Sequence, residues 1–412
     1  MDQYKVRIGD QTLIVSIEKI NSDDPVIIIP PPPSSGKFLI GSNTFPWVPL
    51  SKFSDIGMKS VRCYCPWHWV CTEKGLFTEP MHQAYTNEAP GIDTYLTNAK
   101  AKGIDVLMCF NQCPEWLRPT GNGTNGNDYP PIKPGKSRTD PKSYAEYAEF
   151  FFQVVARYGS VVHPESKLKI DTTPQYPNQP TNQKKSGLGL IKMVEIGNEF
   201  DRWWDGVDSE KYLKPEEHAA MLSACYDAVK SADPSIKVVM AGLTDLNLPY
   251  LKAMYVWAQN NRLDKSFPAD IINVHHYSNI GNTPGDFSPN WQNNGACNPD
   301  KDPAFHQIDE IVSWAKSIGK SVFVTEFGAD TKPPSMMHVL GGEMAQAELI
   351  MKSFEAYEAA GVSAAYVFTA IDDLNAVNGG QFQTCGIMTS QATGMKPKPA
   401  HAAIKNLIAS RM

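Results

Sequence analysis

From residue 38 to its end, the chain alternates short apolar runs with longer amphipathic segments. The apolar runs are rich in Val, Ile, Phe and Tyr, which favours buried strands, whereas the longer segments have the apolar spacing of helices. Eight strands are predicted, at residues 38–43, 60–65, 104–110, 190–197, 237–242, 271–277, 321–326 and 364–370. This alternation predicts repeated βα units around a parallel sheet.

Start and stop signals support the helices between these strands. Proline is favoured in the first turn of a helix, and it occurs at Pro141, Pro215 and Pro249. Further helices are predicted at 303–318, 345–361 and the C-terminus. Glycine follows a helix and precedes a strand at Gly57, Gly103, Gly319 and Gly361, where a helix C-cap is expected. Eight consecutive βα units, without a glycine-rich nucleotide loop after the first strand, predict an α/β fold of the (β/α)₈ TIM-barrel type.

The chain is expected to have two parts. Residues 1–33 read as an N-terminal β extension that ends in a Pro-rich linker, and residues 34–412 as the barrel that carries the chemistry. Two long segments, 111–139 and 278–302, each follow a predicted strand. In a barrel they lie at the C-terminal face, where binding loops belong.

Composition narrows the range of partners. The 412 residues carry a net charge of −6, and Lys and Arg are scattered, so neither nucleic acid nor an anionic membrane is an expected partner. Eight cysteines without a CxxC pair are expected to be buried free thiols. The N-terminus shows no signal-peptide pattern, but a mature or trimmed chain would also lack one. We expect a monomer that acts outside the cell or in the periplasm.

Two glutamates carry the strongest chemical signal. Glu199 ends the motif VEIGNE at the fourth predicted strand, and Glu326 ends VFVTE at the seventh. Cleavage of a glycosidic bond requires two carboxyl groups, one to protonate the leaving oxygen and one to act on the anomeric centre. Strand ends in one barrel can place them about 5 Å apart, which is the spacing of retaining enzymes. The sequence therefore predicts a retaining glycosidase.

These motifs resemble the clan A glycoside hydrolases, the superfamily of (β/α)₈ cellulases, mannanases, xylanases and β-glycosidases. The resemblance covers about residues 38 to 410 in order and spacing. It implies that Glu199 is the acid/base, that Glu326 is the nucleophile, and that Asn198 binds the sugar 2-hydroxyl. It also implies that Arg62 partners the nucleophile.

The same resemblance places His275 and Tyr277 at the sixth strand, where a tyrosine commonly bonds to the nucleophile. Two positions depart from the pattern. Phe200 stands where many members have proline, and the eighth strand offers Phe368 instead of tryptophan. These departures leave the mechanism intact, but the sugar stays open among glucan, mannan and xylan.

Tryptophans cluster after the predicted strands, on the side of the two glutamates. The seven in question are Trp47, Trp67, Trp69, Trp116, Trp203, Trp204 and Trp291. Sugars present C–H faces that stack on aromatic rings, so this placement suits a glycan. About half are expected only to pack loops onto the barrel. Trp67, Trp116 and Trp204 are the predicted sugar-binding residues.

Other readings of the chemistry remain open. The pair His275-His276 could bind a metal, but that chemistry requires ligands at the first strand, and Gly41-Ser42-Asn43 supplies none. We therefore expect no metal and no cofactor. The alternatives to a glycosidase are a barrel that binds carbohydrate without cleaving it and a metal-dependent hydrolase. Four aspartates are predicted to be loop or substrate-binding groups: Asp201, Asp205, Asp372 and Asp373.

Overall fold

A computed structural model gives the fold of the chain. It describes residues 2–8, 11–17, 38–71, 75–77, 91–118, 129–173, 182–277, 305–332, 342–374 and 382–411. The chain forms two compact units, Met1–Ser35 and Gly36–Met412. The predicted Pro-rich linker and the long segment 278–302 lie outside the described residues.

The first unit contains an antiparallel pair of strands, β1 (Asp2–Ile8) and β2 (Gln11–Ile17). Ile8 pairs with Gln11, so only Gly9 and Asp10 connect the two strands. A two-residue connection that contains glycine is the commonest way to join an antiparallel pair.

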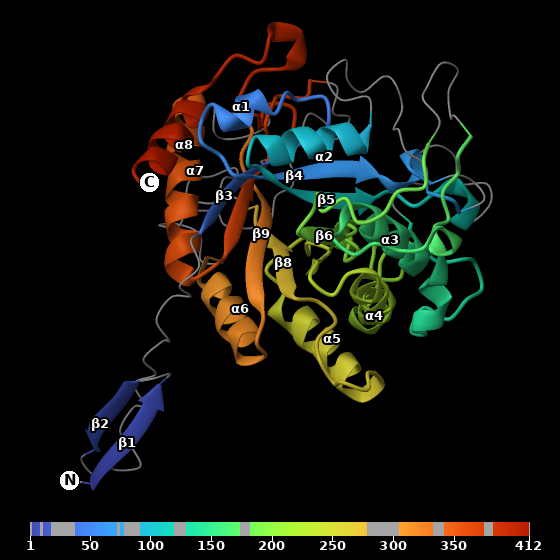
Figure 1. The fold of residues 1–412 in the computed structure, drawn as a ribbon. Helices are drawn as coiled ribbons and strands as arrows, with labels where there is room; N and C mark the ends of the chain where they lie inside the picture. Colours follow the sequence, from blue (N-terminus) through green and yellow to red (C-terminus); the bar gives the residue numbers. More distant parts are fainter. Residues whose placement is uncertain are drawn as a thin grey trace. The chain divides into compact units, whose positions relative to one another are not determined.

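The second unit is built on a closed barrel of eight strands (Figure 1). The strands are β3 (Leu39–Thr44), β4 (Ser60–Pro66), β5 (Asp105–Asn111), β6 (Met193–Ile196), β7 (Lys237–Met240), β8 (Ile271–His275), β9 (Ser321–Phe327) and β10 (Ala364–Val367). Every neighbouring pair is parallel, and β10 closes the barrel against β3. The predicted (β/α)₈ TIM barrel is confirmed.

Helices alternate with these strands and surround the barrel (Figure 1). They are α1 (Ser51–Ser54), α2 (Ile92–Ala101), α3 (Ala145–Tyr158), α4 (Pro215–Ala232), α5 (Leu248–Asn261), α6 (Phe305–Ser317), α7 (Glu343–Ala360) and α8 (Pro399–Ala409). Short polar side chains cap some of their starts: the Tyr250 N–H donates to Asn247 Oδ1, 3.0 Å away, at the start of α5. All four glycines predicted to end helices have a positive φ, as Gly361 has at 86°.

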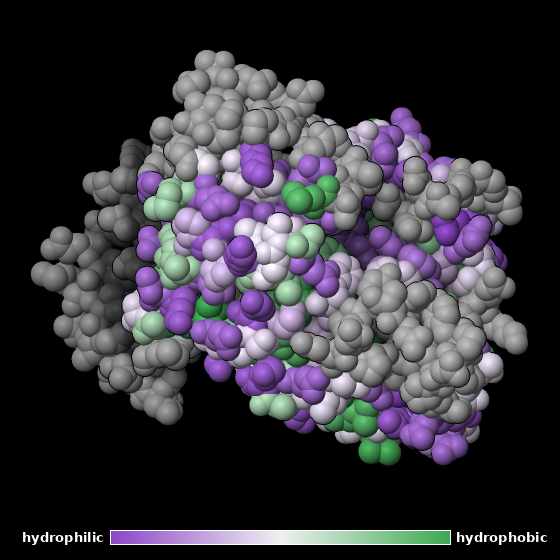
Figure 2. Space-filling view, turned by 90° about the horizontal axis from the view of Figure 1, so that it is seen from above, coloured by the Kyte–Doolittle hydropathy of each residue, from purple (hydrophilic) through white to green (hydrophobic). Residues whose placement is uncertain are grey.

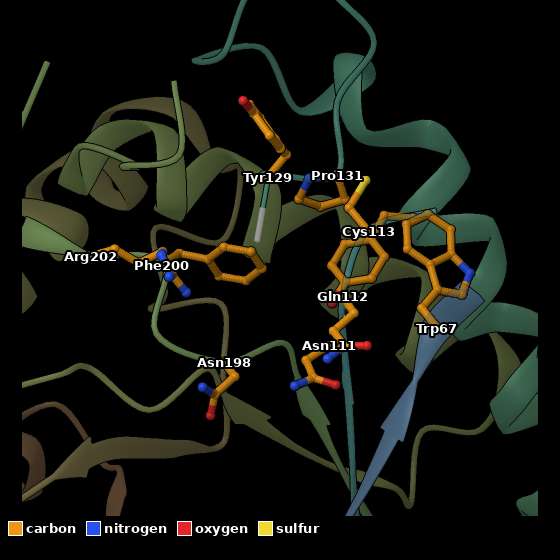
Figure 3. A pocket seen from close by; sticks show the side chains of 10 residues that line it. Trp67, Asn111, Gln112, Cys113, Tyr129, Pro131, Asn198, Phe200 and Arg202 are labelled. Atoms are coloured by element: carbon orange, nitrogen blue, oxygen red, sulfur yellow. The ribbon is translucent and has the colours of Figure 1, made fainter. Parts of the chain in front are cut away.

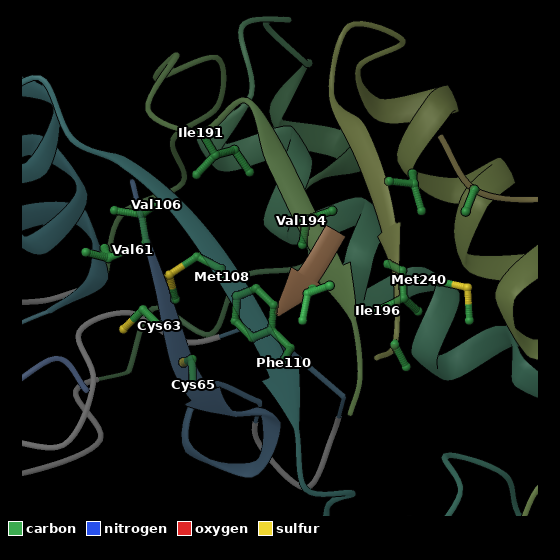
Figure 4. Close-up of a cluster of buried hydrophobic side chains, with 14 of the residues drawn as sticks. Val61, Cys63, Cys65, Val106, Met108, Phe110, Ile191, Val194, Ile196 and Met240 are labelled. Atoms are coloured by element: carbon green, nitrogen blue, oxygen red, sulfur yellow. The ribbon is translucent and has the colours of Figure 1, made fainter. Parts of the chain in front are cut away.

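Side chains that point outward from the strands form the main hydrophobic core. Alternate residues such as Val61, Cys63, Val106 and Met108 are buried between the strands and the helices (Figure 4). Full burial of such a side chain contributes about 1.5–3 kcal/mol. This layer holds the helices on the barrel and fixes the direction in which the remaining strand residues point.

The barrel interior is divided into an apolar and a polar zone. A separate apolar cluster fills it toward the strand starts, with Leu107, Met193, Val239, Ile271, Phe323, Ala364 and Tyr366. Nearer the strand ends the buried inward residues are polar, among them Asn43, Arg62, Glu195, Asn273 and Glu326. The C-terminal face of the barrel is therefore where buried chemistry is concentrated.

Four strands end earlier than predicted, among them β7 at Met240 instead of residue 242 and β8 at His275 instead of residue 277. The fourth strand was expected at 190–197, but β6 ends at Ile196, and Gly197 has a φ of 84° that takes the chain out of the ladder. The eighth was expected at 364–370, but β10 ends at Val367.

The surface of the described residues is mainly polar. Exposed hydrophobic side chains such as Leu263 and Val162 are scattered, and on the face shown in Figure 2 the hydrophobic groups drawn in colour are small and separate. None of the described helices has the length and apolar character needed to cross a membrane. Seven cysteines in the described part are buried free thiols, as predicted, and Cys297 lies outside it.

Candidate active site

The two predicted catalytic glutamates lie near each other at the barrel mouth. Glu326 belongs to β9 and is 5% exposed. Glu199 lies three residues beyond β6 in a left-handed conformation, with a φ of 47°, and its N–H donates to the Gly242 carbonyl at 3.1 Å. One oxygen of each carboxylate and one nitrogen of His275 all lie within 4.8 Å of one another.

His275 lies between the two carboxylates at the end of β8. Its Nδ1 is 2.7 Å from Glu199 Oε1, and its Nε2 is 3.4 Å from Glu326 Oε1. The ring is fully buried, and Nε2 also lies 3.1 Å from the Thr325 hydroxyl. Only glycine fits opposite this ring, because a Cβ at Gly242 would lie 2.1 Å from Nε2. The imidazole of His275 can therefore interact with the carboxylates of both Glu199 and Glu326.

Arg62, in β4, joins the polar groups of the barrel interior. It donates to Glu195 at 2.6 and 2.9 Å and to Glu326 Oε1 at 2.7 Å. It also donates to Asn198 Oδ1 at 2.7 Å and to Asn43 Oδ1 at 2.9 Å. Its side chain is fully buried, so one guanidinium balances two carboxylates away from water.

Two tyrosine hydroxyls complete the surroundings of Glu326. Tyr277 donates to Oε2 at 2.8 Å, and Tyr64 donates to Oε1. Arg62 in turn donates to the Tyr64 hydroxyl. Both oxygens of the Glu326 carboxylate are thus oriented by hydrogen bonds from two parts of the barrel mouth: Arg62 and Tyr64 in β4, and Tyr277 just beyond β8.

Sequence reasoning missed four members of this network: Asn43, Tyr64, Glu195 and Asn273. Glu195 is fully buried and accepts a hydrogen bond from Asn273 Nδ2 at 2.9 Å as well as those from Arg62. The available signal was a charged residue inside an apolar strand run, since a buried charge needs a partner. Arg62 and Glu195 both met that description.

The electrostatic surroundings separate Glu326 from an ordinary buried carboxyl. Burial by itself raises the pKa of Glu326, but the charges of His275 and Arg62, with the hydroxyls of Tyr64 and Tyr277, outweigh burial and hold the pKa below its ordinary value. Burial lowers the pKa of His275, but Glu326 and Glu199 outweigh it, and the pKa is raised. Glu326 is therefore ionised at neutral pH.

Asp201 follows the acid/base candidate by two residues and has different surroundings. It is 4% exposed, and it accepts hydrogen bonds from the Thr244 N–H at 3.0 Å and the Thr244 hydroxyl at 3.1 Å. Burial and the charge of Glu199 raise the pKa of Asp201 to about 7, although its hydrogen bonds act in the opposite direction. Asp201 ties the loop after β6 to the loop after β7.

Two other predicted loop aspartates have protein partners. Asp372 accepts from Lys398 Nζ at 2.7 Å and from the Gly386 N–H at 2.9 Å. Asp205 pairs with Arg202 Nε at 2.9 Å. These contacts give both side chains a role in holding loops.

An aromatic cluster lies beside the nucleophile candidate. The ring centroid of Tyr277 is 6.4 Å from that of Phe368 and 5.3 Å from that of Phe382, and the two phenylalanines are 5.4 Å apart. Phe368 directly follows β10 and is half-buried. It lies where the resembled superfamily has tryptophan.

The predicted sugar-binding tryptophans differ in exposure. Trp67 is 1% exposed, and its ring packs at 4.8 Å on Tyr147 and at 6.1 Å on Trp116, which is half-buried. Trp204 is 38% exposed, with the Arg202 guanidinium 5.0 Å above its ring. Packing dominates at Trp67 and Trp116, whereas Trp204 keeps an exposed surface.

An open pocket lies next to Asn198 (Figure 3), with about 410 Å³ of space that includes open solvent. Ten residues line it: Trp67, Asn111, Gln112, Cys113, Tyr129, Pro131, Tyr147, Asn198, Phe200 and Arg202. The lining combines aromatic rings with amide groups.

The same three residues that form the catalytic candidate are also metal-binding types. Glu199, His275 and Glu326 could each offer one ligand atom. The guanidinium of Arg62, 2.7 Å from Glu326, opposes a cation at this position because like charges repel. The cluster is better suited to moving a proton between its own members.

Part of the chain matches a known protein family. Residues 191–362, which run from the residues just before β6 to the end of α7 and contain both glutamates, match the family described as Cellulase (glycosyl hydrolase family 5). Together with the closed eight-strand barrel, this match over part of the chain supports the resemblance to the clan A glycoside hydrolases. As an enzyme the chain is an O-glycosyl hydrolase. No curated protein matches the chain.

Solved structures share the fold at low identity. A family 39 glycoside hydrolase from Bacteroides cellulosilyticus WH2 is 16% identical, with a TM-score of 0.58 over 99% of this chain and 69% of its own. A glucosidase from Croceicoccus marinus is 14% identical, with a TM-score of 0.57 over 92% and 69%. An endo-β-1,4-mannanase from Thermotoga petrophila is 13% identical, with a TM-score of 0.52 over 91% and 77%.

Proposed function

We propose that the hydrolase cleaves β-linked glycans with retention of configuration, through a covalent glycosyl-enzyme intermediate. Glu199 is the acid/base and Glu326 the nucleophile. The observation that supports this most directly is the approach of the two carboxylates, which have one oxygen each within 4.8 Å. Retaining enzymes have carboxyl groups about 5–5.5 Å apart, whereas inverting enzymes need about 6.5–9.5 Å to admit a water molecule.

In the first step Glu326 attacks the anomeric carbon, while Glu199 gives its proton to the glycosidic oxygen. The lowered pKa of Glu326 keeps this carboxylate ionised and ready to attack. Arg62 and Tyr277 orient its oxygens. Asn198, with its Oδ1 fixed by Arg62, presents its amide nitrogen toward the sugar 2-hydroxyl.

In the second step Glu199, now ionised, takes a proton from water, which attacks the anomeric carbon and releases Glu326. His275 Nδ1, 2.7 Å from Glu199 Oε1, holds the Glu199 carboxylate in position at this stage. His275 thereby keeps the same carboxylate oriented while Glu199 acts as acid in one step and as base in the next.

The substrate class is a β-linked oligo- or polysaccharide, and glucan, mannan and xylan are the first candidates. The related structures include a glucosidase and a mannanase, so the fold alone does not choose among these sugars. We place the hydrolase, acting as a monomer, outside the cell or in the periplasm, where such polymers occur.

Substitution of each glutamate tests the assignment. Glu326→Ala removes the nucleophile, so kcat should fall at least about 10⁴-fold on every glycoside. Glu199→Ala should retain turnover of 4-nitrophenyl glycosides, whose leaving group needs no proton, and added azide should rescue it as a glycosyl azide of retained configuration. Product stereochemistry by NMR and initial rates are the measurements.

A matched control separates these effects from a general loss of carboxylates. Glu358, in α7, pairs with Arg411 at 2.6 Å and is half-exposed, so Glu358→Ala should keep full activity. If Glu199→Ala and Glu326→Ala showed equal residual activity on an activated substrate, the assigned roles would be wrong. If the wild-type hydrolase cleaved nothing in a broad glycan panel, a barrel that only binds carbohydrate would take the place of this proposal.

A further inference from the structure

Tyr277 depends on side-chain packing for its orientation. It lies two residues beyond the end of β8, outside the strand pairs of the barrel. The residue before it, His276, donates its N–H to the Glu326 carbonyl at 2.9 Å. The rings of Phe368 and Phe382 pack edge-on against the Tyr277 ring. Because the Tyr277 hydroxyl donates to Glu326 Oε2 at 2.8 Å, whatever holds these two rings also aims the hydroxyl at the proposed nucleophile.

The end of β9 positions the first of these rings. β9 ends at Phe327, one residue after Glu326, and the Phe327 carbonyl accepts the N–H of Phe368 at 2.7 Å. The next residue, Gly328, leaves room for the Phe368 carbonyl, since a Cβ there would lie 2.3 Å from that oxygen. The backbone of Phe368 is therefore fixed by the two residues that directly follow the proposed nucleophile.

Asp330, four residues beyond Glu326, holds the segment that carries the second ring. Asp330 is 1% exposed, and both of its carboxylate oxygens accept backbone N–H groups. Oδ2 accepts from Phe382 at 2.7 Å, and Oδ1 accepts from the Thr384 N–H at 2.7 Å and the Thr384 hydroxyl at 3.1 Å. The Thr384 hydroxyl in turn accepts the Thr331 N–H at 3.1 Å. The loops after β9 and β10 are thereby joined beside the proposed nucleophile.

The backbone of Phe382 needs this support. Its φ is 64°, in the left-handed region that residues with a Cβ rarely adopt. Such a conformation persists only where the surrounding structure holds it. The hydrogen bond from the Phe382 N–H to Asp330 supplies that hold, and the Phe382 ring centroid lies 5.3 Å from that of Tyr277. Loss of the Asp330 carboxylate should therefore displace the ring that packs on Tyr277.

We infer that Asp330 is a positioning residue for the nucleophile. Residues 326–330 carry the nucleophile and also fix both rings that turn Tyr277 toward it. Asp330 acts on Glu326 through Phe382 and Tyr277, and it has no catalytic step of its own. The inference rests on the proposed function and deepens it, because it adds to the reaction a residue that works through the packing of the mouth.

A double-mutant cycle with Tyr277→Phe tests this route in the full-length enzyme. The substrate is the best cleaved of the 4-nitrophenyl β-glycosides of glucose, mannose and xylose. Asp330→Asn keeps one acceptor oxygen but turns an NH₂ group toward the other backbone N–H, so one of the two bonds is lost. It should lower kcat/KM about tenfold at neutral pH, because the bond from Tyr277 to the charged Glu326 is weakened. In Tyr277→Phe, which already lacks this bond, the further loss should stay below about twofold.

The pH profile separates misalignment of Tyr277 from a loss of charge. The titratable groups of the described chain that face Glu326 are Arg62 and Tyr64 from β4, Glu199 from the loop after β6, His275 from β8, and Tyr277. The Tyr277 hydroxyl helps to lower the pKa of Glu326, so its misalignment should move the acidic limb of kcat/KM about 0.5–1 pH unit higher. Loss of the negative charge of Asp330 alone would move the limb to lower pH, because the ionised form of Glu326 would be repelled less.

Asp233→Asn is the matched control for Asp330→Asn. Asp233 is also 1% exposed, and its two oxygens accept the N–H groups of Ser160 at 2.6 Å and Ser235 at 2.9 Å. It lies between α4 and the start of β7, on the opposite face of the barrel from the glutamates. Its substitution should lower the thermal midpoint without changing kcat/KM or the acidic limb.

Phe382→Leu tests the same route if Asp330→Asn does not fold. It removes the ring that packs on Tyr277 and leaves the Asp330 carboxylate in place. It should give the same tenfold loss as Asp330→Asn, and the same small further loss in Tyr277→Phe. Circular dichroism checks that each variant is folded.

The outcomes separate this inference from the proposed function. An equal loss in both backgrounds, no loss, or an acidic limb that stays in place or moves to lower pH would overturn the positioning role and leave the catalytic assignment intact. If the wild-type enzyme cleaved nothing in a broad glycan panel, or if Glu326→Ala kept full activity, the proposed function would fail and this inference with it.

Discussion

Glu326 and Asp201 are both buried carboxyl groups near the barrel mouth, but their pKa values move in opposite directions. Glu326 lies among a guanidinium, an imidazole and two phenol hydroxyls, and its pKa is lowered. Asp201 accepts hydrogen bonds from neutral donors, among them the N–H and hydroxyl of Thr244, and its burial and the nearby charge of Glu199 raise its pKa to about 7. Burial alone therefore does not decide whether a carboxyl is ionised. The charged groups buried beside the carboxyl decide whether it is ionised.

Removal of Arg62 should reduce the difference between the pKa values of Glu326 and Asp201, and we expect it to have the largest effect of the substitutions below. Arg62→Met leaves Glu195 and Glu326 buried without their cation, so the free energy of unfolding should fall by about 3–5 kcal/mol. The pKa of Glu326 should rise toward that of Asp201. Urea denaturation measures the first effect, and the pH dependence of kcat/KM measures the second.

Arg62→Lys serves as its control. Lysine keeps the positive charge but not the planar set of donors that reaches Glu195, Asn198 and Glu326 together. It should restore part of the stability and less of the activity. An Arg62→Met variant as stable as the wild type would contradict the assigned role of this ion pair.

Substitution of His275 tests how much its charge contributes to the lowered pKa of Glu326. His275→Gln keeps a donor toward Glu199 but removes the charge that lowers the pKa of Glu326. The nucleophile must be ionised, so activity is lost as the pH falls through the pKa of Glu326. Raising this pKa should move the acidic limb of the kcat/KM profile to higher pH, and activity at neutral pH should fall roughly 10- to 100-fold.

An unchanged acidic limb would mean that Arg62 and the tyrosines alone set the ionisation of Glu326. His276→Gln is a useful comparison, because His276 is the next residue and its Nδ1 bonds to the Tyr357 hydroxyl at 3.1 Å, outside the carboxylate pair. This variant should leave the acidic limb in place.

Asp201→Asn should have the smallest effect, and mainly on stability. In the folded chain Asp201 keeps its proton up to about pH 7, whereas an unfolded chain releases it near the ordinary value of 3.8. Folding therefore takes up a proton between these values, and the stabilisation present at low pH is lost as the pH rises through about 7. Without this carboxyl, the fall in the unfolding free energy between pH 4 and pH 7 should be smaller than in the wild type by on the order of 1–3 kcal/mol.

Thermal unfolding at several pH values measures this slope, with Asp264→Asn as control. Asp264 is paired with Arg262 at the surface, and its pKa is lowered, so its loss cannot flatten the curve in the same direction. The kcat of Asp201→Asn should stay within about threefold of the wild type, since the Oδ1 of asparagine can still accept from Thr244.

The strands could be predicted from the sequence because their apolar runs are short, regular and bounded by helices. The positions of Glu199 and Glu326 near strand ends followed from the same pattern. What the pattern lacks is the backbone beyond each strand: the positive φ of Gly197 and Glu199 turns the acid/base candidate inward, and no periodicity encodes that turn.

The interior network was harder to predict for a different reason. Asn43, Tyr64 and Asn273 look like ordinary strand residues in the sequence, because their partners come from other strands. Which polar residues meet depends on strand register, which is fixed only when the barrel closes. The glutamate in the middle of β6 was the exception, since a charge in an apolar run already calls for a partner.

Gly242 has no side chain, yet it sets the spacing of the reacting groups. Its carbonyl accepts the N–H of Glu199, and its missing Cβ leaves the space in which His275 lies. Any other residue would force the ring away from one carboxylate or the other. A library of random substitutions should therefore return glycine almost without exception at this position, while the tryptophans around the mouth tolerate exchange. In the evolution of new specificities, the sugar-contacting surface can change as long as this one position does not.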